Sequence, residues 1–352
     1  MKKMKFPISK YRLSVLVLLF SFAAFAGEVE LTKTINKVYP IKPDVQFSVV
    51  NSFGKIHLNT WDKSELKVDV EVLVEGRNDS KAQQLLDKID IRIIETSGLI
   101  SFETKLRDNT NTNKDESFEI NYSISLPAEN AIIVENQFGD TFIGSRKGDS
   151  DLLIKFGNLK ASDFKGKLKL NLQFGNGVIA ETVDADVLIK YGELEMGNGK
   201  IMDMEQQFSE VNIGDFERLD LESKYGSFSM NTVGEITADV QFSEFEIEKI
   251  NISGYMESNY ASDFEVGILS KDASFFKFYG KFSQLSLGLD PSMKADLEAD
   301  MSFCNLKDYS DLLNFYYESK EDTKKEYKAK IGGGDSNRKI VIKSSYGDAK
   351  IK

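Results

Sequence analysis

The chain has 352 residues, a formal net charge of −11 and a single cysteine, Cys304. One cysteine cannot form an intramolecular disulfide, so buried apolar area and backbone pairing must stabilise the fold. The acidic balance argues against nucleic acid and against anionic membrane surfaces as partners.

Residues 1–26 have the pattern of a secretory signal peptide. Five lysines and arginines accompany the start of a mostly apolar run at 13–25, and Ala24-Phe25-Ala26 fits the small-x-small cleavage rule. The sequence predicts cleavage between Ala26 and Gly27. An uncleaved anchor is the alternative, which we disfavour because the apolar run is too short to span a bilayer comfortably.

Cleavage would bring the net charge from −11 to −16, because the leader carries five positive charges and no acid. No cysteine lies near the cleavage point, so a lipoprotein anchor has no attachment residue. We expect no transmembrane segment in the mature chain, since no later run is long and apolar enough.

The mature chain is predicted to be all-β, because five prolines are few and proline interrupts β ladders. Residues 27–130 are expected to form a β-rich N-terminal region that covers the first exposed edge of a repeat structure. One short helix is predicted at 80–88, with Ser80 as its cap, and a polar loop at 108–116. The predicted strands of this region are 45–50, 66–74, 89–94, 99–105 and 118–126.

Residues 131–352 repeat one short phrase: an aromatic residue, a small residue, a polar residue, and two apolar residues with one position between them. Self-similarity at a fixed period of 17 or 18 residues indicates a repeat architecture. Further copies begin at Phe53, Phe282, Phe303 and Tyr346. The regular copies begin at Phe138, Phe156, Phe174, Tyr191, Phe208, Tyr225, Phe242 and Tyr260, and the glycines among their second residues are Gly139, Gly157, Gly175, Gly192 and Gly226.

The apolar alternation slips by one residue inside each repeat. Before the aromatic it follows the period of a strand, as at Leu168, Leu170 and Leu172, and after it the apolar residues are displaced, as at Leu194 and Met196. Such a slip requires a bend at the small residue, where glycine or serine permits sharp geometry. The favoured fold is a parallel β-solenoid with 17–18-residue rungs; an antiparallel β-meander also fits the spacing.

A solenoid of eleven or twelve rungs would be a rod on the order of 50–60 Å long. The aromatics are predicted to form a buried internal column. The residue before each aromatic is expected to face outward, and its alternation of Gln with Lys keeps like charges apart on adjacent rungs. These residues are Gln137, Lys155, Gln173, Lys190, Gln207, Lys224 and Gln241.

Residues 291–338 break the period. They contain a charge-rich run at 318–330, followed by Gly332-Gly333-Gly334. We expect an insertion or an irregular rung with a solvated face; the alternative is a binding element.

The sequence offers little catalytic chemistry. His57 is the only histidine, which excludes Ser-His-Asp and Cys-His arrangements and histidine-based zinc sites. It is expected to face outward without a role. Cys304 occupies a small corner position and is expected to be a spacer rather than a nucleophile. Trp61 is expected to pack beside the first repeat rather than to form a sugar platform.

The second position after the aromatic is polar and is expected to face outward. On adjacent rungs, Glu193 and Glu210 are candidate ligands for a shared cation such as Ca²⁺; a solvated polar face is the favoured alternative. No calcium repeat, EF-hand loop, P-loop or GxSxG elbow is present, and no catalytic residue or cofactor is predicted. The seven residues at this position are Asp140, Asn158, Asn176, Glu193, Glu210, Ser227 and Glu244.

Three stretches carry a resemblance: Asn51-Ser-Phe-Gly-Lys-Ile-His-Leu-Asn-Thr-Trp61-Asp62-Lys63, the repeated Phe-Gly units, and Ser345-Tyr346-Gly347-Asp348-Ala-Lys-Ile351. They resemble bacterial exported adhesin-like β-strand-repeat proteins, a family of unknown function, and are similar in style to the auto-transporter adhesin head GIN domain. The resemblance covers most of the mature chain. It implies a β-helix-like fold and a cell-envelope setting, and it brings no binding residues.

The leading functional prediction is a non-enzymatic, exported adhesin-like or cell-envelope structural protein, located in the periplasm, at the outer membrane or on the cell surface. Extended repeat surfaces suit binding to another protein or a polysaccharide. One alternative is a polysaccharide-active β-helix lyase or hydrolase, which would use paired carboxylates. Another is an envelope-stress or assembly accessory with a protein partner.

Overall fold

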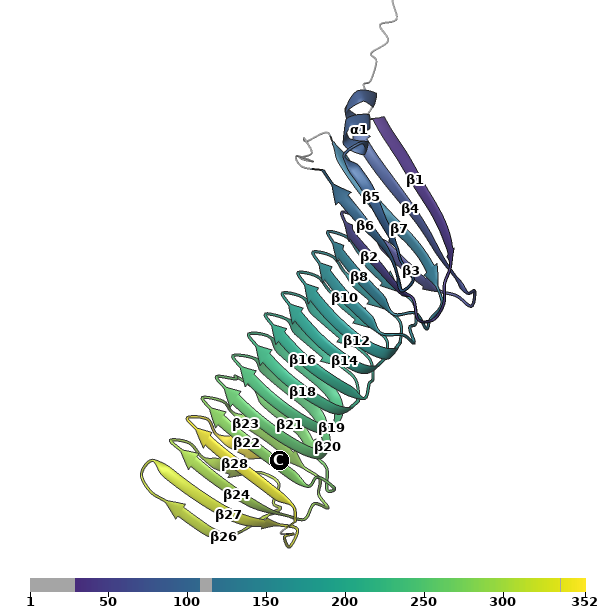
Figure 1. The fold of residues 1–352 in the computed structure, drawn as a ribbon. Coiled ribbons are helices and arrows are strands. Elements are labelled where there is room, and N and C mark those ends of the chain that lie inside the picture. The colour runs from purple at the N-terminus through teal and green to yellow at the C-terminus, as the bar shows by residue number, and fades with distance from the viewer. Residues whose placement is uncertain (1–28, 108–115, 336) are drawn as a thin grey trace, which may run out of the picture.

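The computed structural model describes residues 29–107, 116–335 and 337–352 (Figure 1). The described residues form 29 β-strands and one helix, so the predicted all-β class is confirmed. The predicted leader with its Ala26–Gly27 cleavage site, and positions 108–115 of the predicted loop, lie outside the described residues. Within the described ranges, no helix has the length and apolar character needed to cross a membrane.

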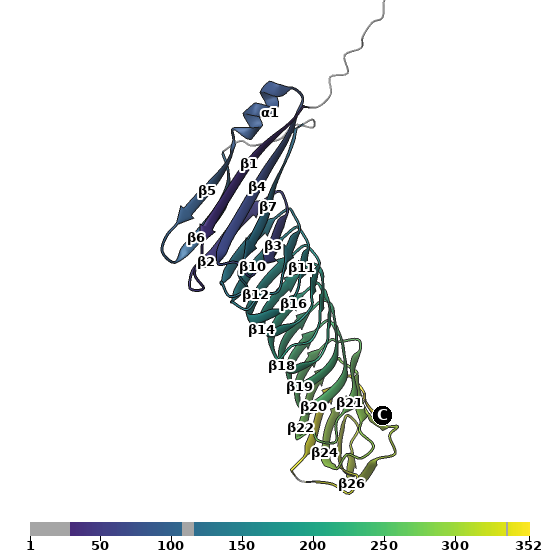
Figure 2. The same ribbon diagram turned by 90° about the vertical axis from the view of Figure 1, so that its right-hand side faces the viewer.

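The molecule is elongated, and two hydrogen-bonded series of strands run along it (Figures 1 and 2). The long strands β19 and β20 belong to both series, because each continues through a corner. In spatial order, the first series is β1 (Val29–Pro40), β4 (Glu65–Gly76), β7 (Ser117–Leu126), β3 (Ile56–Thr60), β9 (Thr141–Ile143), β11 (Leu159–Ala161), β13 (Gly177–Ile179), β15 (Glu193–Met196), β17 (Glu210–Ile213), β19 (Ser227–Gln241), β20 (Glu244–Asn259), β21 (Phe264–Leu269), β23 (Leu285–Leu289), β29 (Ala349–Ile351) and β25 (Leu306–Asp308).

The second series runs beside the first. In spatial order it is β5 (Ile89–Glu95), β6 (Leu99–Leu106), β2 (Gln46–Ser52), β8 (Ile132–Gln137), β10 (Ser150–Lys155), β12 (Phe164–Gln173), β14 (Thr182–Lys190), β16 (Ile201–Gln207), β18 (Phe216–Lys224), the later parts of β19 and β20, β22 (Phe275–Lys281), β28 (Lys339–Ser345), β24 (Ala295–Ser302), β27 (Lys324–Ile331) and β26 (Leu313–Lys320).

Strand pairing is parallel through the repeats and antiparallel at both ends. In the repeats each residue pairs with the residue 17 or 18 positions later, as Leu170 does with Val187 and Val187 with Met204. At the ends, β1–β4–β7, β5–β6 and β24–β27–β26 are antiparallel. Equivalent residues of successive coils therefore form rows along the rod.

The core lies between the two series. Leu168, Leu170 and Leu172 of β12 are buried, as are Leu194 and Met196 on the opposite series. Burial of one such aliphatic side chain stabilises the fold by about 1.5–3 kcal/mol. The period-two alternation on both sides of each corner thus fills one continuous apolar interior.

The helix α1 (Asp79–Leu86) overlaps the predicted range 80–88 and begins one residue earlier, and its cap differs from the prediction. The Asn78 side chain, not that of Ser80, accepts a hydrogen bond from the backbone N–H of Lys81 at 3.0 Å. Ala82 and Leu85 are buried. Asn and Ser are similar N-cap residues, and the helix is capped by Asn78, two positions before the predicted Ser80.

Chain order and spatial order differ at both ends of the stack. Near the N-terminus, β2 lies between β6 and β8, and β3 lies between β7 and β9, although β2 and β3 precede all four of these strands in the chain. Near the C-terminus, β28 and β29 lie between β22/β23 and β24/β25, so the last coil in sequence fills a gap between two earlier ones (Figure 1).

A buried arginine joins the N-terminal strands to the first regular coil. The Arg146 guanidinium donates to the backbone oxygens of Pro127 at 2.9 Å and Asn130 at 2.7 Å, and to Thr60 Oγ1 at 3.2 Å. Burial lowers the pKa of Arg146 to about 10, so the group is charged at neutral pH. Arg146 thereby satisfies carbonyl groups that the corner would otherwise bury without donors.

Candidate functional site

An exposed ladder of twelve aromatic rings runs along one edge of the rod. Neighbouring rings are stacked with centroid distances of 4.7–5.1 Å and interplanar angles of 1–11°. The eleven spacings together span roughly 54 Å, as expected for successive strands. In spatial order the rings are Phe53, Phe138, Phe156, Phe174, Tyr191, Phe208, Tyr225, Phe242, Tyr260, Phe282, Tyr346 and Phe303.

The prediction that these aromatics form a buried column is wrong. The eight regular ones, Phe138 to Tyr260, are 46–49% exposed. Each adopts a left-handed backbone with φ of +52° to +58°, which swings the ring out of the strand alternation and onto the corner. The buried side of each strand ends two positions before the ring, as at Leu172 before Phe174.

The small residue after each aromatic is needed for a reason other than the one predicted. The aromatic, not the glycine, carries the left-handed backbone. A Cβ at Gly157 would lie 2.1 Å from the Gly139 carbonyl oxygen, and one at Gly175 would lie 1.9 Å from that of Gly157. At these two corners the successive backbones therefore approach too closely for a side chain, whereas Ser209 and Ser243 occupy the same position on other coils.

The ring positions conflict with local backbone preference. A left-handed conformation costs a non-glycine residue about 1–2 kcal/mol, least for Asn or Asp. Ring stacking offsets this by about 0.5–1.5 kcal/mol per pair. Half of each ring is nevertheless left in water, and twelve half-exposed rings present on the order of 1,000 Å² of apolar surface, well above the patch size usual for a monomer.

Stacking decides which part of each ring is available. Inside the ladder both faces of a ring are covered by its neighbours, so only ring edges meet solvent. Phe118 covers the outer side of Phe53 edge-on, at 5.2 Å and 64°. The surface therefore cannot offer ring faces for stacking on a flat ligand along its length.

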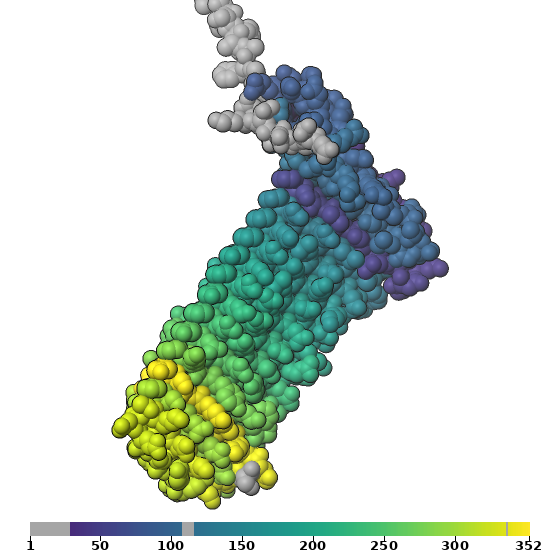
Figure 3. All heavy atoms as spheres, turned by 60° about the vertical axis from the view of Figure 1, so that its left-hand side comes forward, coloured from purple at the N-terminus to yellow at the C-terminus, as the bar shows by residue number. Residues whose placement is uncertain are grey.

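Two grooves follow the ladder, where side chains lie in rows along the rod (Figure 3). One, of about 650 Å³, lies beside Phe53, Phe138 and Phe156 and is also lined by Glu75 and Ser117. The other, of about 870 Å³, lies beside the rings from Tyr191 to Tyr260. Small corner residues form the floor of this second groove, and the polar second-position column forms its far wall.

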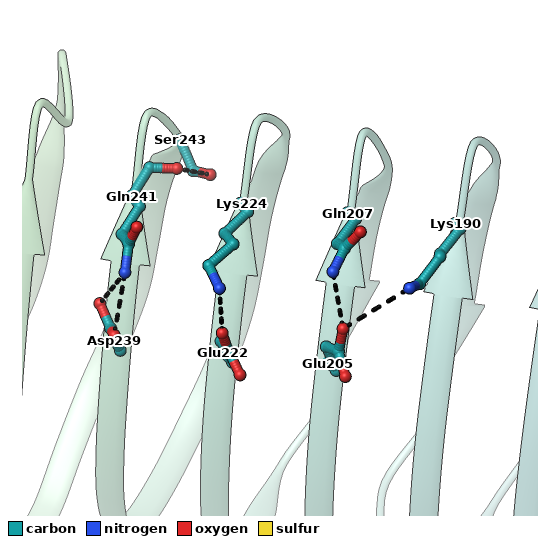
Figure 4. Close-up of polar contacts among 8 residues, drawn as sticks. All are labelled: Lys190, Glu205, Gln207, Glu222, Lys224, Asp239, Gln241 and Ser243. Atoms are coloured by element: carbon teal, nitrogen blue, oxygen red, sulfur yellow. Dashed lines mark hydrogen bonds and ion pairs between the residues drawn. The ribbon is translucent and has the colours of Figure 1, made fainter.

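On the flank before the rings, Lys190 and Lys224 pair with acids of the same protein (Figure 4). Lys190 Nζ lies 3.7 Å from Glu205 Oε1, and Lys224 pairs with Glu222. The hydrogen bond to Glu222 raises the pKa of Lys224. Gln207 also donates to Glu205, at 2.7 Å, and Gln241 donates to both Asp239 oxygens, at 3.1 and 3.2 Å (Figure 4). Glu205, Glu222 and Asp239 are partners that the alternation argument did not identify.

The flank after the rings changes character along the rod. Asp140 Oδ1 accepts from the Asn158 backbone N–H at 3.0 Å, and the pattern continues through Asn158 and Asn176. Beyond Glu193 the backbone N–H groups use corner carbonyls instead, as Glu210 does with Gly192 at 3.0 Å. The first half of this column is thus an amide and carboxylate ladder, as the polar-face alternative expected.

The candidate cation ligands Glu193 and Glu210 pair in register on β15 and β17. Ca²⁺ normally takes six to eight oxygen ligands. Among the described residues, no group of three or more His, Cys, Asp or Glu side chains gathers where it could hold a metal. The remaining ligands of a cation shared by these two glutamates would have to be backbone oxygens, and the cation site stays a prediction.

The three single residues of interest are spread over the molecule. His57 is exposed, as predicted, and stacks on Phe142 at 4.4 Å. Cys304 is buried, with Sγ 3.4 Å from the Ser344 carbonyl oxygen. Trp61 donates from Nε1 to the Glu65 carbonyl at 2.8 Å. The structure brings none of these three into either groove.

No family model and no curated protein matches the chain. Among solved structures, a "putative cell adhesion protein" from Clostridium sporogenes is 11% identical, with a TM-score of 0.18 over 91% of this chain and 99% of that one. A "putative adhesin" from Parabacteroides distasonis is 12% identical, with a TM-score of 0.30 over 73% and 93%. A "putative lipid binding protein" from Parabacteroides distasonis is 12% identical, with a TM-score of 0.25 over 91% and 97%. Likeness at this level carries no argument about this chain.

Proposed function

We propose that the protein is an exported, non-enzymatic binding protein of the bacterial cell envelope, with an adhesin-like role. In this proposal residues 131–352 are a parallel β-solenoid that holds the aromatic ladder straight. Residues 27–130 close one end of it. The ladder and the grooves beside it bind an extended partner at the envelope.

The observation that carries the proposal is the half-exposed ladder itself. Glycine or asparagine would adopt the left-handed corner at less cost than Phe or Tyr. For fold stability alone, other residues would be better at these positions unless the rings contribute by stacking. Stacking by itself does not require that an apolar edge of this size be exposed to solvent. Exposed apolar patches above a few hundred Å² are typical of interaction sites, and a long, regular surface suits an extended partner.

Binding of the fluorescently labelled mature chain to envelope fragments of the producing bacterium tests the proposal. The ladder variant carries Tyr191→Ser, Phe208→Ser and Tyr225→Ser. The control variant carries Tyr309→Ser, Tyr316→Ser and Tyr317→Ser, which removes three exposed aromatics that lie outside the ladder. The ladder variant should lose most of the binding while the control keeps it, with the β-sheet circular dichroism of both unchanged.

Equal binding of both folded variants would overturn the role of the ladder. Protease digestion of intact and of ruptured cells tests the location separately. Degradation in intact cells indicates the cell surface, and protection until rupture indicates the periplasm. Recovery of the intact chain only from the cytoplasm would contradict export.

A further inference from the structure

The groove beside Tyr191–Tyr260 has an asymmetric charge distribution. On one side of the rings, Lys190 and Lys224 are already paired with Glu205 and Glu222 (Figure 4). The charges of these two lysines are thus compensated within the protein. A ligand therefore finds no free cationic row there.

The opposite wall of the same groove carries the exposed acids Glu193, Glu210 and Glu244. Glu193 and Glu210 lie side by side in register, and Ser227 separates Glu210 from Glu244. Like charges on adjacent strands destabilise a sheet. Throughout the described part of the chain, no Lys or Arg lies within ion-pair distance of these three carboxylates. These three carboxylates thus have no positive counter-charge within the described protein, and a partner could supply it.

The rings restrict the chemistry of that partner further. Their faces are covered by one another, at 4.9–5.1 Å, so a sugar ring has no aromatic face to stack on. Ring edges offer an apolar ridge. A lysine or arginine side chain fits such a surface, because its alkyl stem lies on apolar atoms while its charged head reaches a carboxylate.

The dimensions suit an extended chain. Tyr191 to Tyr260 spans four ring spacings, roughly 20 Å, which equals about six residues of extended peptide. A second copy of this protein would bring the same acidic wall and would be repelled. We propose, building on the function proposed above, that this groove binds an extended basic peptide segment of a partner protein.

The groove variant Glu193→Gln, Glu210→Gln and Glu244→Gln tests this proposal, since it removes three charges with little change in shape. Its matched control is Asp186→Asn, Asp203→Asn and Asp220→Asn. These three acids are also exposed and in register, on the outer face of the second strand series away from the ladder. Both variants change the net charge equally, so only the position of the charge differs.

The probe is a fluorescein-labelled eight-residue peptide of alternating lysine and leucine, measured by fluorescence anisotropy with the mature chain. The groove variant should bind about tenfold more weakly than the native chain, equal to about 1.4 kcal/mol, and the control variant should bind within about twofold of it. Added salt should weaken native binding because the pairs are exposed.

Each further outcome has a fixed meaning. Equal binding of a glutamate–leucine peptide or of an uncharged oligosaccharide would overturn the basic ligand. If spermine at matched charge displaces the probe, the ligand is a free polyamine rather than a peptide. An equal loss of peptide affinity in both variants would show that the peptide responds to the net charge of the protein, and the groove would not be the binding site. If the ladder variant loses envelope binding but the glutamate variant does not, the basic-peptide proposal fails and the proposed function stands. If neither variant loses envelope binding, both proposals are refuted.

Discussion

Asp348 accepts a hydrogen bond from the backbone N–H of Asn305 at 2.8 Å, although the two residues are 43 positions apart. Its other carboxylate oxygen lies 2.6 Å from Lys307 Nζ. These contacts join the coil of β28 and β29 to that of β24 and β25. Tyr346 stacks between Phe282 and Phe303 at the same level. The last segment of the chain is therefore a coil inside the stack rather than its end.

Deletion of residues 339–352 should detach the C-terminal strands from the rod. Without β28, strand β24 loses its only parallel partner, and β22 loses its neighbour on that side. We expect new protease cleavage within 291–335 and a lower melting temperature, while residues 131–288 stay resistant; limited proteolysis with mass spectrometry measures this.

The point variant Ile342→Asp should reproduce that cleavage pattern, because it places an unpaired charge at a fully buried position of β28. Val341→Asp, on the outward side of the same strand, is the matched control and should leave the pattern unchanged. Native-like resistance of the truncated chain would show that β24–β27 dock without β28.

Asp348 should make the stability of this coil depend on pH. Burial raises the pKa of Asp348, but the hydrogen bonds from Lys307 and Asn305 outweigh it and lower the pKa below the usual value. The stabilisation is therefore present above the unfolded pKa of about 3.9 and is lost as pH falls through the lower folded value.

Asp348→Asn should accordingly reduce the free energy of unfolding by about 1–3 kcal/mol at pH 7, since charged hydrogen bonds are lost. The difference from the native chain should shrink at a second, strongly acidic pH, because the stabilisation is lost as pH falls through the lowered folded pKa of Asp348. Urea unfolding of both proteins at the two pH values measures it. A difference independent of pH would contradict the role of the carboxylate charge.

Much of the fold follows from the local pattern. The five predicted strands of the N-terminal region match β2, β4, β5, β6 and β7 within a few residues. The alternation of apolar and polar side chains along a strand indicates its buried face, whichever strand it pairs with. The placement of β28 between β22 and β24 has no such local signal, because it depends on which open edges pair across distant sequence.

The candidate site was predictable in position but not in orientation. The repeat located Tyr191 and Gly192 at a corner, since the apolar phase slips there. The sequence does not say which of the two adjacent residues takes the left-handed backbone, and glycine was the natural choice. Choosing the aromatic reverses its side of the sheet, and the ring moves from core to surface. The lysines were expected to face outward, but their partners Glu205 and Glu222 were not identified, because the sequence argument compared only residues at the same position on adjacent rungs.

Phe208→Asp should therefore be tolerated by the fold. The ring is 47% exposed and stacks on Tyr191 and Tyr225, so its loss should cost about 1–3 kcal/mol. Leu221→Asp, on the next coil but fully buried, should unfold the repeats because it buries an unpaired charge. Thermal unfolding followed by circular dichroism compares the two. Equal destabilisation by both substitutions would mean that the Phe208 ring is buried.

Gly175→Ala should destabilise the rod although it adds only one methyl group. The new Cβ would lie 1.9 Å from the Gly157 carbonyl oxygen, so two successive corners must separate, at a cost of about 1–3 kcal/mol or more. Gly98→Ala is the matched control, since a Cβ there meets nothing within 4 Å, and it should be neutral or slightly stabilising. Denaturant midpoints of the two variants measure the difference. A neutral Gly175→Ala would show that the corners are not close-packed through their backbones, and that the column of small residues is required for another reason.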